Sequence, residues 1–394
     1  MKRIILLLSA ACLVLAACAV QGPAQATTEA GSAASEASIV SEQPPAQPEP
    51  EPEPEPKVDN SWRLDRPQNH GMDPALLGQL HAALAGSQIY AMVTAKDGVL
   101  IDEYYQEGYD ENSVFPLHSC SKSFTGALVG IAIEQGYFGG VDDLLSDYLP
   151  QVASLEEGKR QLTLRHLLTH TSGLEWYEWG GGRSNWMEFQ SAENWVAYIL
   201  GRSLVAQPGT LFNYSTGNTH LLSAALTAAT GMDELQYAEE NLFGPLGMES
   251  VEWGRDPQGI CDGGNGISMS ARDAARFGQL YLQGGSWQGE QLVPADWVEA
   301  STSVQNPGPG GRTGQYGYQW WINSFGAKNY DAYFAFGAWG QYIFIVPELE
   351  LVTVITSNYQ NDSYAPWPYF TDYVLAAYRE GEGSGAEYSG NLVS

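Results

Sequence analysis

A serine and a lysine three residues apart are the first side chains in this sequence of 394 residues that could act together in catalysis. Ser119 and Lys122 lie in the stretch HSCSKSFTG, residues 118–126, where an apolar run typical of a buried helix begins. Residues i and i+3 share one face of a helix, so these side chains can approach each other. A partly desolvated lysine near a helix N-terminus can take the proton of a serine and activate it as a nucleophile. The spacing therefore favours nucleophilic catalysis by Ser119; the alternative is a helix cap followed by a surface lysine.

Four further side chains of this stretch could react, and we interpret each as framework. Cys120 lies about 100° around the helix from Ser119 and is expected to face the interior. Ser121 and Ser123 do not lie three residues before the lysine, so we expect them to cap the helix or to face solvent. His118 is interpreted as structural.

Hydrophobic patterns on both sides of this stretch predict a mixed α/β fold. A hairpin is expected early in the globular part, with its turn at Lys96-Asp97-Gly98. Strand patterns return near the end of the chain, and helical patterns dominate between. We therefore expect an antiparallel sheet built from both chain ends, flanked by helices, with a helical subdomain inserted at roughly residues 141–255. The expected strands are 89–95, 99–105, 333–346 and 349–357, and the expected flanking helices are 74–84 and 369–378.

Residues 1–18 are typical of a lipoprotein signal peptide. A basic start, Met1-Lys-Arg, precedes an apolar run over residues 4–15, and the segment ends in Leu15-Ala-Ala-Cys18. This ending resembles the bacterial lipobox, so we expect lipidation of Cys18; the alternative is an ordinary signal peptide. Ala19 after that cysteine resembles the outer-membrane sorting pattern. The expected location is the cell envelope, with a lipid anchor in the outer membrane facing the periplasm.

Composition divides the remaining chain into a tether, a globular domain and a tail. Residues 19–60 are rich in Ala, Ser, Glu and Pro and are expected to form a disordered tether, because they cannot bury enough apolar surface to fold. Residues 61–380 form the expected globular domain, and residues 381–394 a flexible tail. The domain contains only Cys120 and Cys261, which we expect to be buried thiols, although their spacing leaves a disulfide open.

Charge and histidine content argue against several classes of function. Only 18 basic residues stand against 46 acidic ones, giving a formal net charge of -28, so nucleic acid is not an expected partner. No H-E-x-x-H or comparable ligand spacing occurs, and His166 and His170 are expected to form buried hydrogen bonds around the turn 171–173. We expect neither a metal nor an organic cofactor. The sequence gives no indication of oligomeric state.

Five segments, in order along the chain, resemble the serine β-lactamase and penicillin-binding protein superfamily. They fall within residues 69–379 and correspond to its class C-like branch, with family VIII esterases, D-aminopeptidases and 6-aminohexanoate-dimer hydrolases. The resemblance implies a β-lactamase/transpeptidase-like fold and catalysis through an acylated serine. The segments are FPLHSCSKSF (115–124), LTLRHLLTHTSGL (162–174), PGTLFNYSTG (208–217), ARDAARFG (271–278) and GAWGQ (337–341).

The resemblance implies roles for individual residues. Ser119 matches the acylated nucleophile and Lys122 its partner base. Tyr214 matches the tyrosine of the Tyr-x-Asn motif, which shares proton transfer with the lysine and protonates the leaving group. Thr216 stands where the family has asparagine, and a hydroxyl cannot present the separate donor and acceptor of an amide to a substrate. A literal Tyr-x-Asn at residues 359–361 follows the last expected strand, so we interpret it as coincidental.

The third family motif, Lys-Thr-Gly or His-x-Gly on a strand, matches Ala335-Phe-Gly337. Gly337 is expected where a backbone closely approaches a ligand. Ala335 replaces the cation that binds a β-lactam carboxylate, which argues against efficient β-lactamase or transpeptidase activity. The backbone N–H groups of Ser119 and Ala338 match the oxyanion hole, so ester and amide cleavage stays possible.

The segment EWYEWGGGRSNW, residues 175–186, is aromatic and rich in glycine. In this family the region can border the substrate cleft, so we interpret Trp176, Trp179 and Trp186, with Tyr177, as candidate walls for an apolar acyl or alcohol group. The alternative is that these rings cover the helical core.

Together these features predict an exported serine hydrolase that cleaves an ester or amide of a small molecule through an acyl-serine intermediate. Two alternatives stay open. One is a peptidoglycan-directed D-amino-acid peptidase or a weak β-lactamase or penicillin binder. The other is a non-catalytic envelope binding module with the same fold.

Overall fold

The computed structural model describes residues 61–178 and 184–380, and the structural statements below refer to these ranges. Cys18, Trp179, the expected tether and the expected tail lie outside the described residues. Within the two ranges, no helix combines the length and the apolar character needed to cross a membrane.

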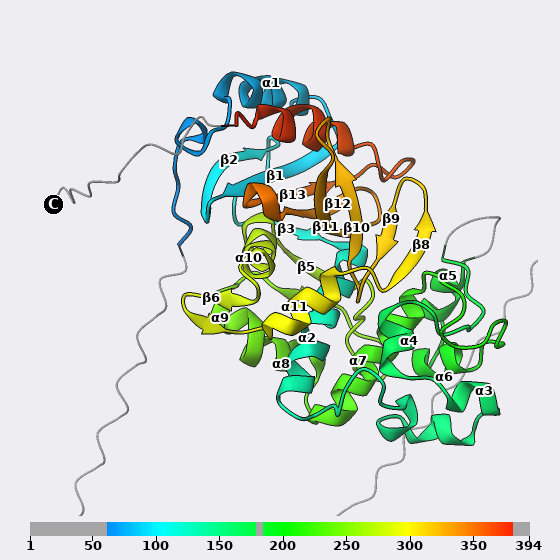
Figure 1. Cartoon of the computed structure of the whole chain (residues 1–394). Coiled ribbons are helices and arrows are strands. Elements are labelled where there is room, and N and C mark those ends of the chain that lie inside the picture. Colours follow the sequence, from blue (N-terminus) through cyan, green and yellow to red (C-terminus); the bar gives the residue numbers. More distant parts are fainter. Residues whose placement is uncertain (1–60, 179–183, 381–394) are drawn as a thin grey trace, which may run out of the picture. The chain divides into compact units, whose positions relative to one another are not determined.

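An eight-stranded antiparallel sheet joins the two ends of the globular part (Figure 1). Its order is β2-β1-β13-β12-β11-β10-β9-β8, so the first strands lie beside the last one. The register pairs Val93 of β1 with Val354 of β13. This arrangement confirms the expected sheet from both chain ends. The strands are β1 (Ile89–Lys96), β2 (Val99–Tyr105), β8 (Asn306–Gly310), β9 (Gly314–Tyr316), β10 (Trp321–Phe325), β11 (Tyr330–Gly337), β12 (Gln341–Val346) and β13 (Leu351–Ser357).

The turns between strands follow local backbone preferences. The expected hairpin β1–β2 turns at Asp97 and Gly98, both with positive φ, as tight two-residue hairpin turns require. The prediction of one strand over residues 333–346 is wrong, because this run forms two strands, β11 and β12. Trp339 and Gly340 separate them with φ values of 65° and 91°. Continuous apolar character concealed the turn, since both strands are buried.

Helices cover both faces of the sheet (Figure 1). Val93 of β1 belongs to the core that includes α2 (Ser121–Glu134) and α10 (Ala271–Leu282). Met92 points to the opposite core, with α1 (Pro74–Leu84) and η7 (Tyr369–Leu375), a π-helical segment. Successive strand residues face opposite sides, so one strand contributes to both cores.

Helix α2 runs through the interior of the domain. All its residues from Ser121 to Ala132 are buried, and it packs against α7 (Thr216–Thr230). Gly130 lets α11 (Ala295–Thr302) approach closely, because an added Cβ there would lie 2.3 Å from the ring of Trp297. The first turn of α2 is therefore held on several sides by packed elements.

Further short helices lie mainly between residues 157 and 246 and form the helical region that Figure 1 shows in green. They are α3 (Glu157–Arg160), α4 (Leu164–Leu168), α5 (Asn185–Gln190), α6 (Trp195–Leu200), α8 (Glu234–Ala238) and α9 (Gly244–Leu246), with the turns η1 (Pro67–His70), η2 (His118–Cys120), η3 (Leu145–Asp147), η4 (Pro150–Ser154), η5 (Glu239–Phe243) and η6 (Pro347–Leu349). Two small sheets contain β3 (Val114–Pro116), β4 (Glu252–Trp253) and β5 (Ile267–Ser270), and β6 (Ser286–Trp287) and β7 (Glu290–Gln291).

Candidate active site

Ser119 lies in η2, the turn that connects β3 to α2. His118 has a φ of 49°, a left-handed conformation that is uncommon outside glycine, and it redirects the chain just before Ser119. Two hydrogen bonds hold the turn. The Cys120 N–H donates to the Leu117 carbonyl over 3.1 Å, and the Ser121 hydroxyl donates to the His118 carbonyl over 2.6 Å. Ser119 is thus fixed by its neighbours at the start of a buried helix.

Lys122 is buried, with 1 % of its surface exposed, and its Nζ donates to three oxygen atoms. The distances are 3.1 Å to Ser119 Oγ, 2.9 Å to Thr216 Oγ1 and 2.6 Å to the Gly264 carbonyl. Burial lowers the pKa of Lys122 to about 8, although the nearby Glu178 carboxylate acts in the opposite direction. Near pH 8 a large fraction of the molecules therefore carries a neutral amine.

These contacts fix the direction of the electron pair of neutral Lys122. A neutral amine has two N–H donors and one electron pair. The Gly264 carbonyl can only accept, and the Thr216 hydroxyl also accepts, because its own hydrogen is donated to Glu178. The remaining tetrahedral direction points to Ser119, whose hydroxyl hydrogen the amine can take. This is the geometry of a general base poised on a nucleophile.

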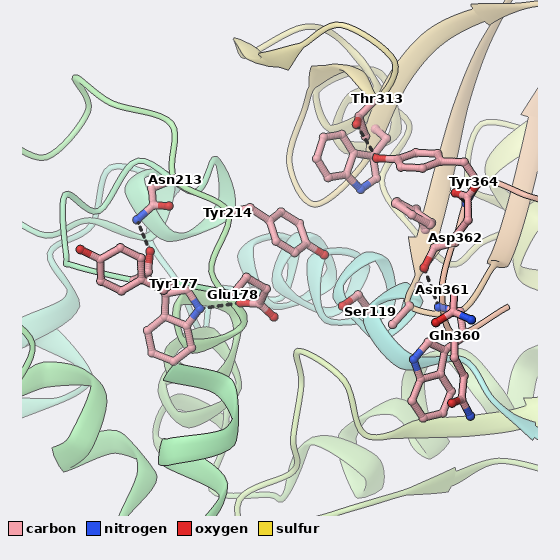
Figure 2. A pocket seen from close by; sticks show the side chains of 17 residues that line it. Ser119, Tyr177, Glu178, Asn213, Tyr214, Thr313, Gln360, Asn361, Asp362 and Tyr364 are labelled. Atoms are coloured by element: carbon pink, nitrogen blue, oxygen red, sulfur yellow. Dashed lines mark hydrogen bonds between the residues drawn. The ribbon is translucent and has the colours of Figure 1, made fainter. Parts of the chain in front are cut away.

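Tyr214 lies on the loop before α7, and its hydroxyl points toward Ser119 (Figure 2). Its ring stacks on Trp321 with centroids 5.4 Å apart and contacts His170 at 4.7 Å. Lys122 Nζ lies 4.8 Å from the centre of the same ring. Burial raises the pKa of Tyr214 well above its ordinary value, so the hydroxyl keeps its proton at neutral pH.

Ser119 and Tyr214 line a cavity of about 730 Å³ (Figure 2). Its volume is in the range of small-molecule sites. Glu178 and Asp362 contribute carboxyl groups to its wall. Further lining residues are aromatic and can hold an apolar group: Trp176, Tyr177, Trp321, Phe336, Trp339 and Tyr364.

The structure brings part of the expected site together at this cavity. The expected residues on its wall are Ser119, Tyr214, Trp176, Tyr177, Gly337 and Ala338. Lys122 contacts Ser119 from the buried side.

Three expected substrate-binding residues are not among the lining residues. Thr216 is fully buried, and its hydroxyl contacts Lys122 rather than open space. Ala335 is buried in the core that contains α2, so it contributes no charge to the site. Trp186 packs against the helical core, which was the alternative interpretation.

Gly337 brings the end of β11 against the nucleophile turn. A Cβ at this position would lie 2.2 Å from the Leu117 carbonyl oxygen, so only glycine fits. The sequence predicted a close backbone approach here, and the structure shows that the partner includes the protein's own backbone. Ala338 follows directly and lines the same cavity as Ser119, and its role as an oxyanion-hole donor stays a prediction.

Sequence reasoning missed Glu178 and the loop after β13. Glu178 belongs to the segment 175–186, in which only the aromatic side chains were interpreted as candidate cavity walls. Asn361 and Asp362 line the cavity although the literal Tyr-x-Asn motif was interpreted as coincidental. Tyr359 of that motif is not a lining residue, and its hydroxyl contacts Tyr369 at 3.5 Å. The sequence does contain a signal for Asn361 and Asp362. They belong to a polar run directly after an apolar strand, and loops at such positions often carry binding residues.

The remaining residues of the nucleophile stretch are framework. Ser121 and Ser123 were expected to cap the helix or face solvent, and the expectation of exposure is wrong because both are buried. Ser123 donates to the Gln319 carbonyl over 2.7 Å, which ties α2 to a distant loop. Cys120 and Cys261 are buried and unpaired, as expected.

The histidines contact neighbouring polar groups. His170 is fully buried and lies 3.1 Å from the Tyr316 hydroxyl. His166 Nδ1 accepts from the Thr163 N–H over 3.2 Å, within a capping box at the start of α4. Within residues 61–178 and 184–380, no group of three or more His, Cys, Asp or Glu side chains is placed to hold a metal ion.

Comparisons with solved structures support the fold. A penicillin-binding protein homologue from Pyrococcus abyssi superposes with a TM-score of 0.62 at 20% identity, covering 79% of each chain. EstCE1, a hydrolase with promiscuous acyltransferase activity, gives a TM-score of 0.62 at 18% identity, covering 75% of this chain and 97% of its own.

Sequence comparisons identify the family. The 6-aminohexanoate-dimer hydrolase of Paenarthrobacter ureafaciens is 25% identical over 295 residues, which cover 70% of this chain and 74% of that protein. The model of the Beta-lactamase family matches residues 77–374, a range that contains Ser119, Lys122 and Tyr214. This chain therefore belongs to the Beta-lactamase family.

Proposed function

We propose that this protein is a serine hydrolase that cleaves an ester or amide bond of a small molecule through an acyl-serine intermediate. The observation that carries the proposal is the 3.1 Å contact between the buried amine of Lys122 and Ser119 Oγ, beside a cavity of about 730 Å³. Membership of a family with hydrolase relatives supports the reaction class.

In the first step, neutral Lys122 accepts the hydroxyl proton of Ser119 while Oγ attacks the substrate carbonyl carbon. A carbon–oxygen bond forms, and the π electron pair of the carbonyl moves onto its oxygen. The backbone N–H groups of Ser119 and Ala338 stabilise that oxyanion. Such a donor typically contributes about 10²- to 10³-fold to the rate.

In the second step, Tyr214 donates its proton to the leaving alkoxide or amine as the scissile bond breaks. The Lys122 ammonium then gives the proton it took from Ser119 to Tyr214, so the net result is one proton moved from the serine to the leaving group through the lysine and the tyrosine. Water then attacks the acyl-enzyme, passes its proton back along the same route and releases the acid. Ser119 is regenerated.

A fluorophosphonate probe tests the nucleophile. We expect labelling of the wild-type protein at Ser119, no labelling of Ser119→Ala, and much slower labelling of Lys122→Ala. Ser123→Ala is a matched control, because Ser123 lies four residues after Ser119, in α2, and its hydroxyl donates to the Gln319 carbonyl. A folded wild-type protein that resists labelling would favour the non-catalytic binding module.

Substrate class is tested by comparing p-nitrophenyl butyrate, nitrocefin and D-alanyl peptides at equal enzyme concentration. We expect the highest kcat/KM for the ester. The reason is that Ala335 supplies no cation for the carboxylate of a β-lactam or a peptide. Faster turnover of nitrocefin or of the peptides would reverse this ranking.

We also propose that the chain is exported and anchored in the outer membrane, facing the periplasm, by a lipid on Cys18. The lipobox-like ending Leu15-Ala-Ala-Cys18 supports this proposal. Metabolic labelling with radioactive palmitate is expected to mark the wild-type protein and not Cys18→Ala. Equal labelling of both, or of neither, would contradict lipidation at this residue.

A further inference from the structure

The Thr216 hydroxyl bridges the catalytic lysine and a buried carboxylate. Lys122 Nζ donates to Thr216 Oγ1 over 2.9 Å, and Thr216 Oγ1 in turn donates to Glu178 Oε1. A hydroxyl has a single hydrogen, so its donation to Glu178 leaves only oxygen electron pairs facing Lys122. The bridge therefore has a defined direction, from lysine through threonine to glutamate.

Glu178 is held so that it can only accept. Its Oε2 takes hydrogen bonds from the Thr216 N–H over 2.8 Å and from Trp176 Nε1 over 2.5 Å. With the Thr216 hydroxyl, three donors converge on one carboxylate that is 8 % exposed, so its oxygen atoms are occupied as acceptors. Trp176 is itself fixed by close packing, since a Cβ on Gly217 would lie 2.8 Å from its ring.

The direction of this bridge matters for the nucleophile. If the Thr216 hydroxyl were free to rotate, its hydrogen could turn to the electron pair of neutral Lys122. It would then compete with the Ser119 hydroxyl for the same base. The Glu178 carboxylate prevents that rotation, because a charged acceptor binds a hydroxyl more strongly than a neutral amine does.

We propose that Glu178 is a positioning residue that acts through Thr216 to keep the free electron pair of Lys122 directed at Ser119. This inference rests on the proposed serine-hydrolase function. It assigns a role to Thr216, which stands where the family has asparagine, and to its hydrogen-bond partner Glu178.

The primary test is Glu178→Gln, assayed with p-nitrophenyl butyrate between pH 6 and pH 10. Glutamine has nearly the same shape, but its NH₂ group conflicts with at least one of the three converging donors. We expect kcat/KM to fall by about 10- to 100-fold at its plateau, with KM little changed. We also expect the acidic limb of the profile to move to lower pH, because the Glu178 charge raises the pKa of Lys122. The fall at the plateau is the decisive readout, because Lys122 is neutral there in both proteins and loss of the charge alone would move the limb without lowering the plateau.

Thr216 variants test the bridge independently of how Glu178→Gln folds. Thr216→Val removes the hydroxyl and is expected to lower kcat/KM to a similar extent, and Thr216→Ser should restore most of the loss. The double variant Glu178→Gln/Thr216→Val should be no slower than Thr216→Val alone, since both substitutions break one chain of contacts. If the loss of kcat/KM in the double variant equals the product of the losses in the two single variants, the inference is overturned.

Glu175→Gln is the matched control, because it makes the same change three residues away on a side chain that does not line the cavity. It should match the wild type in rate and pH profile. If wild-type protein hydrolyses the ester and Glu178→Gln has full activity at the plateau, wherever its acidic limb lies, the Glu178 inference fails while the proposed function stands. If the wild type is neither labelled by fluorophosphonate nor active, the proposed function itself fails.

Discussion

At the scale of single residues, burial favours opposite protonation states for the two groups proposed to transfer protons. It lowers the pKa of Lys122 to about 8, which favours the neutral base. It raises the pKa of Tyr214 well above its ordinary value, which favours the protonated acid. The same physical cause thus prepares a base and an acid on either side of Ser119, because the charged form of each group is disfavoured by desolvation.

The pH dependence of kcat/KM should report the proton on Lys122. We expect kcat/KM for p-nitrophenyl butyrate to rise about tenfold per pH unit below pH 8 and to level off above it, because only neutral Lys122 can accept the Ser119 proton. Tyr214 stays protonated throughout this range. A rate profile that is flat from pH 6 to pH 9 would contradict a lysine base.

Tyr214→Phe should distinguish poor leaving groups from good ones. An alkyl alkoxide or an amine needs a proton as it departs, whereas p-nitrophenolate does not. We expect kcat for an alkyl ester or an amide to fall by about 10²- to 10⁴-fold, and kcat for the p-nitrophenyl ester of the same acid to fall far less. Equal losses for both substrates would assign Tyr214 to a role other than proton donation.

At the scale of elements, the end of β11 and the turn η2 lie against each other and form the proposed catalytic geometry together. Gly337 permits the contact, and the left-handed conformation of His118 aims Ser119 at it. Trp339, which follows Ala338, contacts the His118 ring at a centroid distance of 4.7 Å. The two segments come from opposite halves of the chain, so their relative position depends on the sheet that holds β11 in place.

Gly337→Ala should separate these elements. The new Cβ would lie 2.2 Å from the Leu117 carbonyl oxygen, so β11 must move and carry Ala338 away from Ser119. We expect kcat/KM to fall by about 100-fold, since small displacements of oxyanion donors have effects of that size. Gly78→Ala is the control, because its Cβ would meet nothing within 4 Å. It should retain wild-type activity. Wild-type activity in Gly337→Ala would refute the proposed contact.

Elements with strong local signals were predictable, and those shaped by distant contacts were not. The β1–β2 hairpin followed from an Asp-Gly turn between apolar runs. Helix α1 covers the expected residues 74–84, and Asp73 before it accepts a hydrogen bond from the Ala75 N–H over 2.8 Å. In contrast, β8 has the sequence NPGPG, which disfavours a strand. It pairs only at the edge of the sheet, where proline is tolerated.

The same division applies to the site. Ser119 and Lys122 are three residues apart, so their contact follows from helix geometry. Glu178 contacts Thr216 across 38 residues of chain, and no periodic pattern links the two positions. The loop that contains Asp362 lines the cavity because it follows the end of β13, next to the cavity.

At the scale of the whole molecule, a buried carboxylic acid beneath the site couples stability to pH. Glu234 is fully buried in α8, and burial raises its pKa to about 7. The unfolded chain has the ordinary pKa near 4.5. The folded state therefore binds the extra proton between pH 4.5 and pH 7, and stability falls as pH rises through that window.

Glu234→Gln should remove this dependence. From the difference in pKa, the loss is on the order of 3 kcal/mol between pH 4 and pH 8. We expect the variant to have a smaller pH dependence of the free energy of unfolding than the wild type, measured by urea denaturation at several pH values. Glu239→Gln, at an exposed carboxylate nearby, is the control. If the free energy of unfolding of Glu234→Gln depends on pH as strongly as that of the wild type, groups other than Glu234 cause the dependence.

The pairing of β1 with β13 has a consequence for how the protein is made. Hydrogen-bonded partners in these strands, such as Ala91 and Thr356, are separated by 265 residues, so the middle of the sheet cannot close during most of synthesis. In the nascent chain, the hairpin β1–β2 has no strand to pair with β1 until residues 351–357, which form β13, have been synthesised. A truncation before that strand would leave the nucleophile turn present but the sheet that positions its oxyanion partner unassembled.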